Sequence, residues 1–137
     1  MEDWIEVALS QWTEQNVKLN TPATQTSIEQ AEYKLGFQFP QDFKQLYLVV
    51  DGFNDYEWQE HMFSIWSLER IIEEYENSGD EDFIGFCDFL ICSHFIGFSK
   101  ADINIWKKFS IVYSKDPLSG TFKEIIRLVN DSHDSIY

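Results

Sequence analysis

The sequence predicts an α+β fold in which N-terminal helices pack on a central, mainly antiparallel sheet and a C-terminal helix closes the domain. Three stretches differ in hydrophobic period. Residues 3–53 repeat apolar side chains at helical spacing, residues from about 63 to 114 contain strand-like runs around one helix, and residues 121–130 return to helical spacing. Helices and strands segregated in this way are typical of α+β rather than alternating α/β proteins. The 137 residues suit one domain, 1–137.

The first predicted helix covers residues 3–15. Its apolar stripe follows the i, i+3, i+4, i+7 pattern with Ile5, Ala8, Leu9 and Trp12. Residues 16–25 are polar and include Pro22, so they form a connection between helices.

Residues 26–53 predict two helices joined at a proline. The first begins with a capping box between Thr26 and Glu29 and ends at Gly36. The second begins at Phe39-Pro40, since proline loses no hydrogen bond in a first turn, and Gly52 closes it. The two stripes predict a helical hairpin: Ile28, Ala31, Glu32 and Leu35, then Phe43, Leu46, Tyr47 and Val50.

The next stretch predicts a loop, a short strand and a helix. Phe53–Met62 has neither the helical nor the strand period, and Phe63–Trp66 reads as a strand. Ser67 then caps a helix whose stripe is Leu68, Ile71, Ile72 and Tyr75. The helix leads into an acidic turn, and Glu73–Asp82 holds six carboxylates and no basic residue.

The following residues predict an antiparallel meander. F-L-I-C-S (89–93) is an apolar run typical of a buried strand, and I-G-F-S (96–99) is a second strand. Residues 102–106 alternate strictly, Lys107-Lys108 forms a turn, and Phe109–Tyr113 is a further strand.

The chain ends with a loop, a helix and a tail. Residues 116–120 are a loop by composition. Thr121 and Glu124 form a capping box for a helix that ends near Asn130, and the tail after it is expected to be frayed.

Charge limits the classes of partner. Residues 1–99 carry 19 acidic and 4 basic side chains, whereas residues 100–137 carry 5 acidic and 6 basic ones. The negative electrostatic field of the acidic residues repels nucleic acid and anionic membranes, and it attracts a basic protein. Many acidic proteins use their charge for solubility alone, so this alternative stays open. The acidic start, Met1-Glu2-Asp3, lacks the basic region of a signal peptide, and we expect a cytoplasmic protein.

No catalytic, cofactor or metal site is predicted. Cys87 and Cys92 are expected to be two buried thiols, too far apart in an extended segment to form a disulfide. Cys92 and His94 would share a strand face, but an apolar stretch without a glycine elbow favours a structural role. His61 and His133 have no second metal ligand at a suitable spacing, and the acidic turn lacks the order of an EF-hand loop.

The loop around Tyr56 and Trp58 is the most informative surface candidate. It combines large aromatic residues with carboxylates, as protein-binding surfaces do. The alternative is that both rings fold back over the sheet.

The stretch I-x-x-x-E-x-x-L-G-F-x-F-P-x-D-F-K-x-L-Y, followed by D-G, resembles the N-terminal signature of the SUKH superfamily. This superfamily contains the Smi/Knr cell-wall-synthesis regulators and many bacterial immunity proteins. Thr121-Phe122 resembles the start of its final helix, whereas residues 97–106 depart from its glycine-rich turn. The structural signature comprises Ile28, Glu32, Leu35, Gly36, Pro40, Phe43, Tyr47, Gly52, Thr121 and Phe122.

The resemblance implies a non-catalytic immunity protein that neutralises a cognate toxin domain, often a basic nuclease. The expected partner surface consists of Asp55, Tyr56, Glu57, Trp58, Glu73, Glu74, Glu76, Asp80, Glu81 and Asp82. A regulatory scaffold of the cell-wall type is the alternative, followed by a ligand-binding domain or an enzyme.

Overall fold

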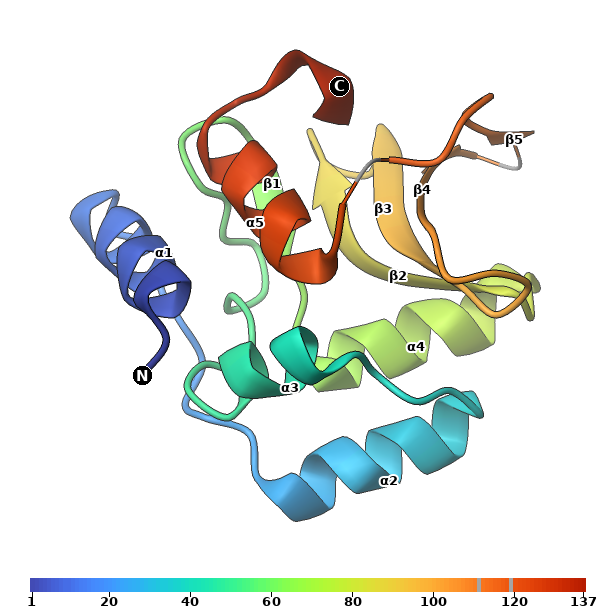
Figure 1. Ribbon diagram of the computed structural model, residues 1–137, viewed down its shortest axis with the longest axis horizontal. Helices are drawn as coiled ribbons and strands as arrows, with labels where there is room; N and C mark the ends of the chain where they lie inside the picture. The colour runs from blue at the N-terminus through green and yellow to red at the C-terminus, as the bar shows by residue number, and fades with distance from the viewer. Residues whose placement is uncertain (111, 119) are drawn as a thin grey trace.

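The computed structural model describes residues 1–110, 112–118 and 120–137, and it confirms the α+β fold (Figure 1). The elements are α1 (Asp3–Glu14), α2 (Gln25–Leu35), α3 (Gln41–Tyr47), β1 (Phe63–Ile65), α4 (Leu68–Ser78), β2 (Phe83–Phe89), β3 (His94–Ser99), β4 (Ile105–Phe109), β5 (Val112–Tyr113), α5 (Phe122–Asn130) and a short 3-10 helix, η1 (Asp134–Ile136).

The strands form one antiparallel meander in the order β1-β2-β3-β4-β5, as predicted. Helices α3 and α5 cover one face, here called the inner face, and α1 packs on α5 (Figure 1). Helix α4 runs beside β2 and contacts α2 (Figure 1). The two helices of the predicted hairpin pack mainly on other helices: α2 packs on α4, and α3 packs on α5.

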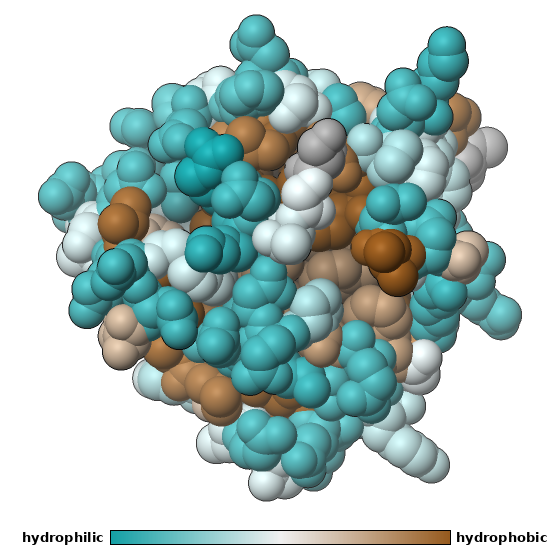
Figure 2. All heavy atoms as spheres, viewed as in Figure 1, coloured by the Kyte–Doolittle hydropathy of each residue, from teal (hydrophilic) through white to brown (hydrophobic). Residues whose placement is uncertain are grey.

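The inner face is built from phenylalanine. Phe122 of α5 contacts Phe86 and Phe43 at ring-centroid distances of 5.0 Å each, and Phe86 lies 4.9 Å from Phe98. Each fully buried ring contributes roughly 1.5–3 kcal/mol by leaving water. Unlike the core, the surface in Figure 2 is mainly hydrophilic. Hydrophobic residues in this view gather near its centre, where α5 lies beside the sheet.

Helix α2 begins two residues earlier than the predicted capping box. Thr24 Oγ1 accepts a hydrogen bond from Ser27 N, and Thr24 N donates to Ser27 Oγ. The prediction of Thr26 and Glu29 was therefore wrong, because the frame T-x-x-S satisfies the same orphan groups one half-turn earlier. Gly36 ends the helix in the left-handed conformation, as predicted.

Buried Glu32 explains the polar residue in the α2 stripe. Its Oε2 accepts a hydrogen bond from Phe39 N at 2.8 Å and lies 3.3 Å from Lys44 Nζ. The carboxylate thus joins α2 to the start of α3, where Pro40 is the N-cap residue.

Helix α3 ends at Tyr47, not at Gly52 as predicted. Tertiary hydrogen bonds hold the following residues outside the helix: Phe53 N donates to the Ile65 carbonyl, and Asn20 N donates to the Gly52 carbonyl. Val50 still packs in the core.

The β2–β3 region corrects three predictions. The buried strand is Phe83–Phe89, and residues 90–93 form the turn after it instead of continuing the strand. Cys87 is buried, but Cys92 is exposed, and both are free thiols. Because Cys92 lies in the turn, it does not share a strand face with His94.

The β4–β5 region is shifted relative to the prediction. Lys107 and Lys108 lie within β4 rather than in a turn. The predicted strand Phe109–Tyr113 includes Ile111, and the predicted loop 116–120 includes Ser119; these two residues lie outside those described.

The C-terminal tail is packed, so the prediction of fraying was wrong. Ile136 is fully buried, and His94 Nε2 donates to its carbonyl at 2.8 Å. The ring of Tyr137 contacts Phe63 and Phe89.

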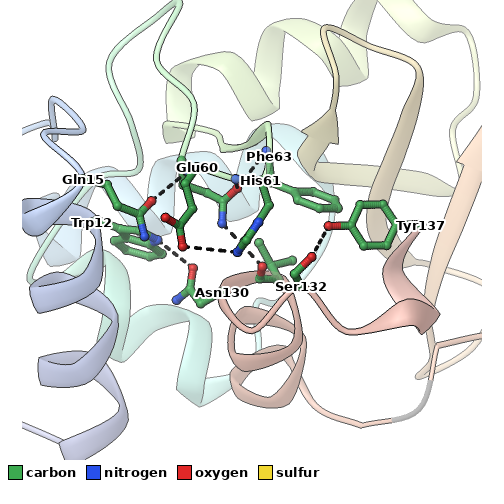
Figure 3. A network of polar contacts seen from close by, with 10 residues as sticks. Trp12, Gln15, Glu60, His61, Phe63, Asn130, Ser132 and Tyr137 are labelled. Carbon is green, nitrogen blue, oxygen red and sulfur yellow. Dashed lines mark hydrogen bonds and ion pairs between the residues drawn. The ribbon is translucent and has the colours of Figure 1, made fainter.

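Polar contacts near the tail tie distant segments together (Figure 3). Trp12 Nε1 of α1 donates to Asn130 Oδ1 of α5, and Glu60 N of the 53–62 loop donates to Gln15 Oε1. The far end of that loop is thereby fixed to the helical layer.

Substituting Gly52 tests the close approach of two backbone segments. Gly52 has φ +64°, and an added Cβ would lie 2.4 Å from the Trp66 carbonyl oxygen. We expect Gly52→Ala to reduce the urea midpoint far more than Gly79→Ala, which has φ +75° but nothing within 4 Å of an added Cβ. The control should lose only the left-handed cost of about 1 kcal/mol. Equal losses would contradict this packing.

The packed tail predicts a pH dependence. Burial lowers the pKa of His94 from its usual 6.5. The unfolded chain therefore takes up a proton more readily, and stability should fall as the pH decreases through 6.5 toward the lower folded pKa. In His94→Gln, an amide N–H that does not titrate replaces the imidazole donor, so the unfolding free energy of this variant should depend less on pH between about 7.5 and 5.5. Parallel curves for both proteins in urea unfolding would contradict this role.

Candidate functional site

Helix α4 is the element around which the surface candidates gather. Ser67 Oγ accepts from Arg70 N, and Asp51 Oδ1 accepts from Leu68 N, so two side chains cap its start. Leu68 and Ile71 face the core, which turns the acidic side chains of the helix toward solvent.

An acidic cavity of about 310 Å³ lies between α4, the 53–62 loop and the β2–β3 turn. We define the acidic cavity by its lining residues, Asp55, Tyr56, Trp58, Ser64, Arg70, Glu73, Glu74, Asp88, Ile91 and Cys92. Five of the ten predicted partner residues thus line one site, although they come from two stretches of sequence.

The floor of the acidic cavity is a buried carboxylate. Asp88 is 1% exposed; its Oδ1 accepts from Trp66 Nε1 at 2.6 Å, and its Oδ2 accepts from Cys92 N at 2.9 Å. Arg70 lies 3.5 Å from the same carboxylate and stacks 4.6 Å from the centroid of the Trp66 ring. These contacts fix the position of the floor.

The two aromatic residues of the predicted protein-binding loop, Tyr56 and Trp58, differ in their exposure to solvent. Tyr56 is 83% exposed, whereas Trp58 is half-buried. Glu57 turns away from the acidic cavity, and its Oε1 accepts from Lys18 N at 2.8 Å. The ring of Tyr56 is exposed to solvent.

The other predicted partner residues lie toward the C-terminal end of α4 and in the turn that follows. Glu76, Glu81 and Asp82 are exposed. Asp80 is bound within the chain: Lys108 Nζ lies 2.9 Å from its Oδ2, and Tyr113 donates to the same oxygen. Burial alone would raise the pKa of Asp80, but these two hydrogen bonds lower it.

A second hollow, of about 250 Å³, continues along α4 onto the outer face of the sheet. Four of its ten lining residues are aromatic: Trp66, Tyr75, Phe83 and Phe95. Lys108 also lines it, and its charge is already paired with Asp80.

The cysteine and histidine side chains lie in separate environments. Burial and the Asp88 carboxylate raise the pKa of the Cys92 thiol, which is the opposite of nucleophile activation. His94 packs against Phe63 and Phe89. Among residues 1–110, 112–118 and 120–137, no three His, Cys, Asp or Glu side chains are grouped as a metal site. Within the same residues, no helix has the length and apolar character needed to cross a membrane.

Sequence reasoning missed Arg70, Asp88 and Ile91 as parts of the site. One signal was present: Asp88 is a carboxylate within an apolar stretch, and a buried charge needs partners. Nothing in the sequence indicated that the turn after it faces Tyr56.

The Asp80 contacts predict a stability difference between two neighbouring carboxylates. Asp80→Ala leaves the ammonium group of Lys108, which is 8% exposed, without its partner, at an expected cost of about 1–3 kcal/mol. Asp82→Ala removes the same charge from an exposed position and should change stability by about 0.5 kcal/mol or less. Similar urea midpoints for the two variants would show that the Asp80–Lys108 ion pair contributes nothing to stability.

Comparison of the sequence with models of known protein families identifies the family of this chain. The model of the SMI1 / KNR4 family (SUKH-1) matches residues 22–135, which include every element except α1 and the end of η1. A search of curated proteins gave no match. Because the match covers most of the chain, the protein belongs to the SMI1 / KNR4 family (SUKH-1).

Proposed function

We propose that this chain is a non-catalytic immunity protein that acts in the cytoplasm by binding and neutralising a toxin domain. One observation carries the proposal: carboxylates and aromatic side chains from two separate stretches converge on the acidic cavity. Aromatic residues supply rigid contact area, and carboxylates steer a partner of opposite charge.

The charge distribution supports a basic partner. The excess of acidic residues lies in residues 1–99, which include the whole of α4 and the 53–62 loop. A basic toxin domain would be attracted over about a Debye length, roughly 8–10 Å at physiological salt.

Family membership supports a binding role, and the pKa of Cys92 gives no sign of an activated nucleophile. A regulatory scaffold of the cell-wall type is the second candidate, because the same exposed carboxylates and Tyr56 would serve to hold a signalling partner.

Co-expression separates the two functions. Any toxin domain encoded beside this chain's gene is expressed from a repressible promoter in a bacterial host, with and without this chain. Immunity predicts that this chain restores growth and purifies as a complex with that domain. Growth arrest that this chain does not relieve, or a gene neighbourhood without a toxin, would overturn the proposal and favour the scaffold.

The binding surface predicts a position-dependent charge effect. In the triple variant Asp55→Asn, Glu73→Gln, Glu74→Gln, association with that toxin domain should slow by about tenfold at low salt and lose much of its salt dependence. The control Glu6→Gln, Glu14→Gln, Glu29→Gln removes equal charge from exposed positions on α1 and α2. Stopped-flow rates across a salt series measure both. If the two triple variants slow equally, the net charge acts and the acidic cavity does not.

A further inference from the structure

The turn between β2 and β3 presents apolar side chains from an unfavourable backbone. Leu90, Ile91 and Cys92 have φ values of 48°, 53° and 67°, in the left-handed region that β-branched residues avoid. Ile91 is 67% exposed and Leu90 is 47% exposed. Packing within the chain therefore does not explain why a large apolar residue occupies this position.

Contacts from the core hold the turn in place. Leu90 N donates to the Met62 carbonyl at 2.9 Å, and Cys92 N donates to Asp88 Oδ2 at 2.9 Å. Ile91 is thereby fixed at the edge of the acidic cavity, which Tyr56 also lines from the 53–62 loop. Tyr56 also has a positive φ, 65°, and is exposed.

The charged side chains that line the acidic cavity have a net negative charge. Four carboxylates and one guanidinium line the acidic cavity. Asp88 lies 3.5 Å from Arg70, so this pair is largely neutral. Asp55 and Glu73 form no ion pair with any residue that the structure describes, and Glu74 only reaches Arg70 at 3.9 Å. The acidic cavity is left with an excess of negative charge beside exposed apolar surface.

We propose that the acidic cavity is the anchor site for one arginine side chain of a protein partner, with apolar neighbours of that arginine packing on Tyr56 and Ile91. This inference rests on the proposed function and names its anchor. Arginine fits better than lysine because a planar guanidinium binds carboxylates through two hydrogen bonds and stacks on aromatic rings. Arg70 shows part of this chemistry within the chain, because its guanidinium stacks on Trp66 and forms an ion pair with Asp88.

A peptide probe tests the site without the toxin. The probe is Ac-Leu-Arg-Leu-NH₂, and its control carries citrulline, the neutral isostere, in place of arginine. In an NMR titration, the arginine peptide should shift the amide signals of Glu73, Glu74 and Ile91, and the citrulline peptide should shift them at least about tenfold more weakly. Equal shifts with both peptides, or shifts confined to other surfaces, would overturn the inference.

Ile91→Asn separates binding from folding. Asparagine tolerates the left-handed region, so this variant should be as stable as the parent or more stable, while its affinity for the arginine peptide falls by about tenfold. The matched control is Ile103→Asn, at a fully exposed isoleucine in the β3–β4 loop. Unchanged peptide affinity in Ile91→Asn would overturn the role of this turn.

The toxin assay keeps the two proposals apart. If the chain protects against the toxin domain but Ile91→Asn protects equally well and the arginine peptide does not bind, the anchor is wrong and the immunity function stands. If the peptide binds at the acidic cavity and no toxin is neutralised, the anchor stands and the partner belongs to another class.

Discussion

The buried carboxylate of Asp88 is the constraint on which the rest of the surface depends. It accepts hydrogen bonds from Trp66, which lies between β1 and α4, and from Cys92 in the β2–β3 turn, and Arg70 of α4 compensates its charge. Removing one partner of such a buried pair costs about 3–5 kcal/mol in typical proteins. One side chain near the end of β2 thus contacts two of the three segments that border the acidic cavity, α4 and the β2–β3 turn.

Hydrogen bonds also explain how a loop, which is usually a mobile element, forms part of a rigid site. Loops are the usual place for recognition because they vary without disturbing the core. Here the 53–62 loop is held at its far end by Gln15 and by Gln59, whose Oε1 accepts from the Phe63 backbone. Near its middle, the ring of Tyr56 is 83% exposed to solvent. A preformed surface loses less conformational entropy on binding, which favours affinity.

Local signals predicted the fold where they act within one element. The caps at Ser67 and Thr121 and the left-handed end at Gly36 were predicted correctly because each satisfies backbone groups of its own helix. The start of α2 was missed because two capping frames overlap within the six residues 24–29, and sequence alone does not rank them.

Other features depended on residues far away in sequence. The apolar run at 89–93 has the composition of a strand, yet the Met62 carbonyl and the Asp88 carboxylate hold it as a turn. The tail lacks a stripe of its own, and Ile136 is buried by a niche that β3 and α5 create. The acidic residues of the candidate site were predictable from composition, whereas the Asp88 floor and the Ile91 rim emerge only when three segments meet.

The most direct test is amide hydrogen exchange of this chain, free and in complex with a toxin domain that it neutralises in the co-expression assay. Binding at the acidic cavity predicts slower exchange in the bound state for residues 54–58, 70–76 and 90–92, with little change in α1 and α2. Protection confined to α1, α2 or the C-terminal tail would contradict the central claim that this surface recognises the partner.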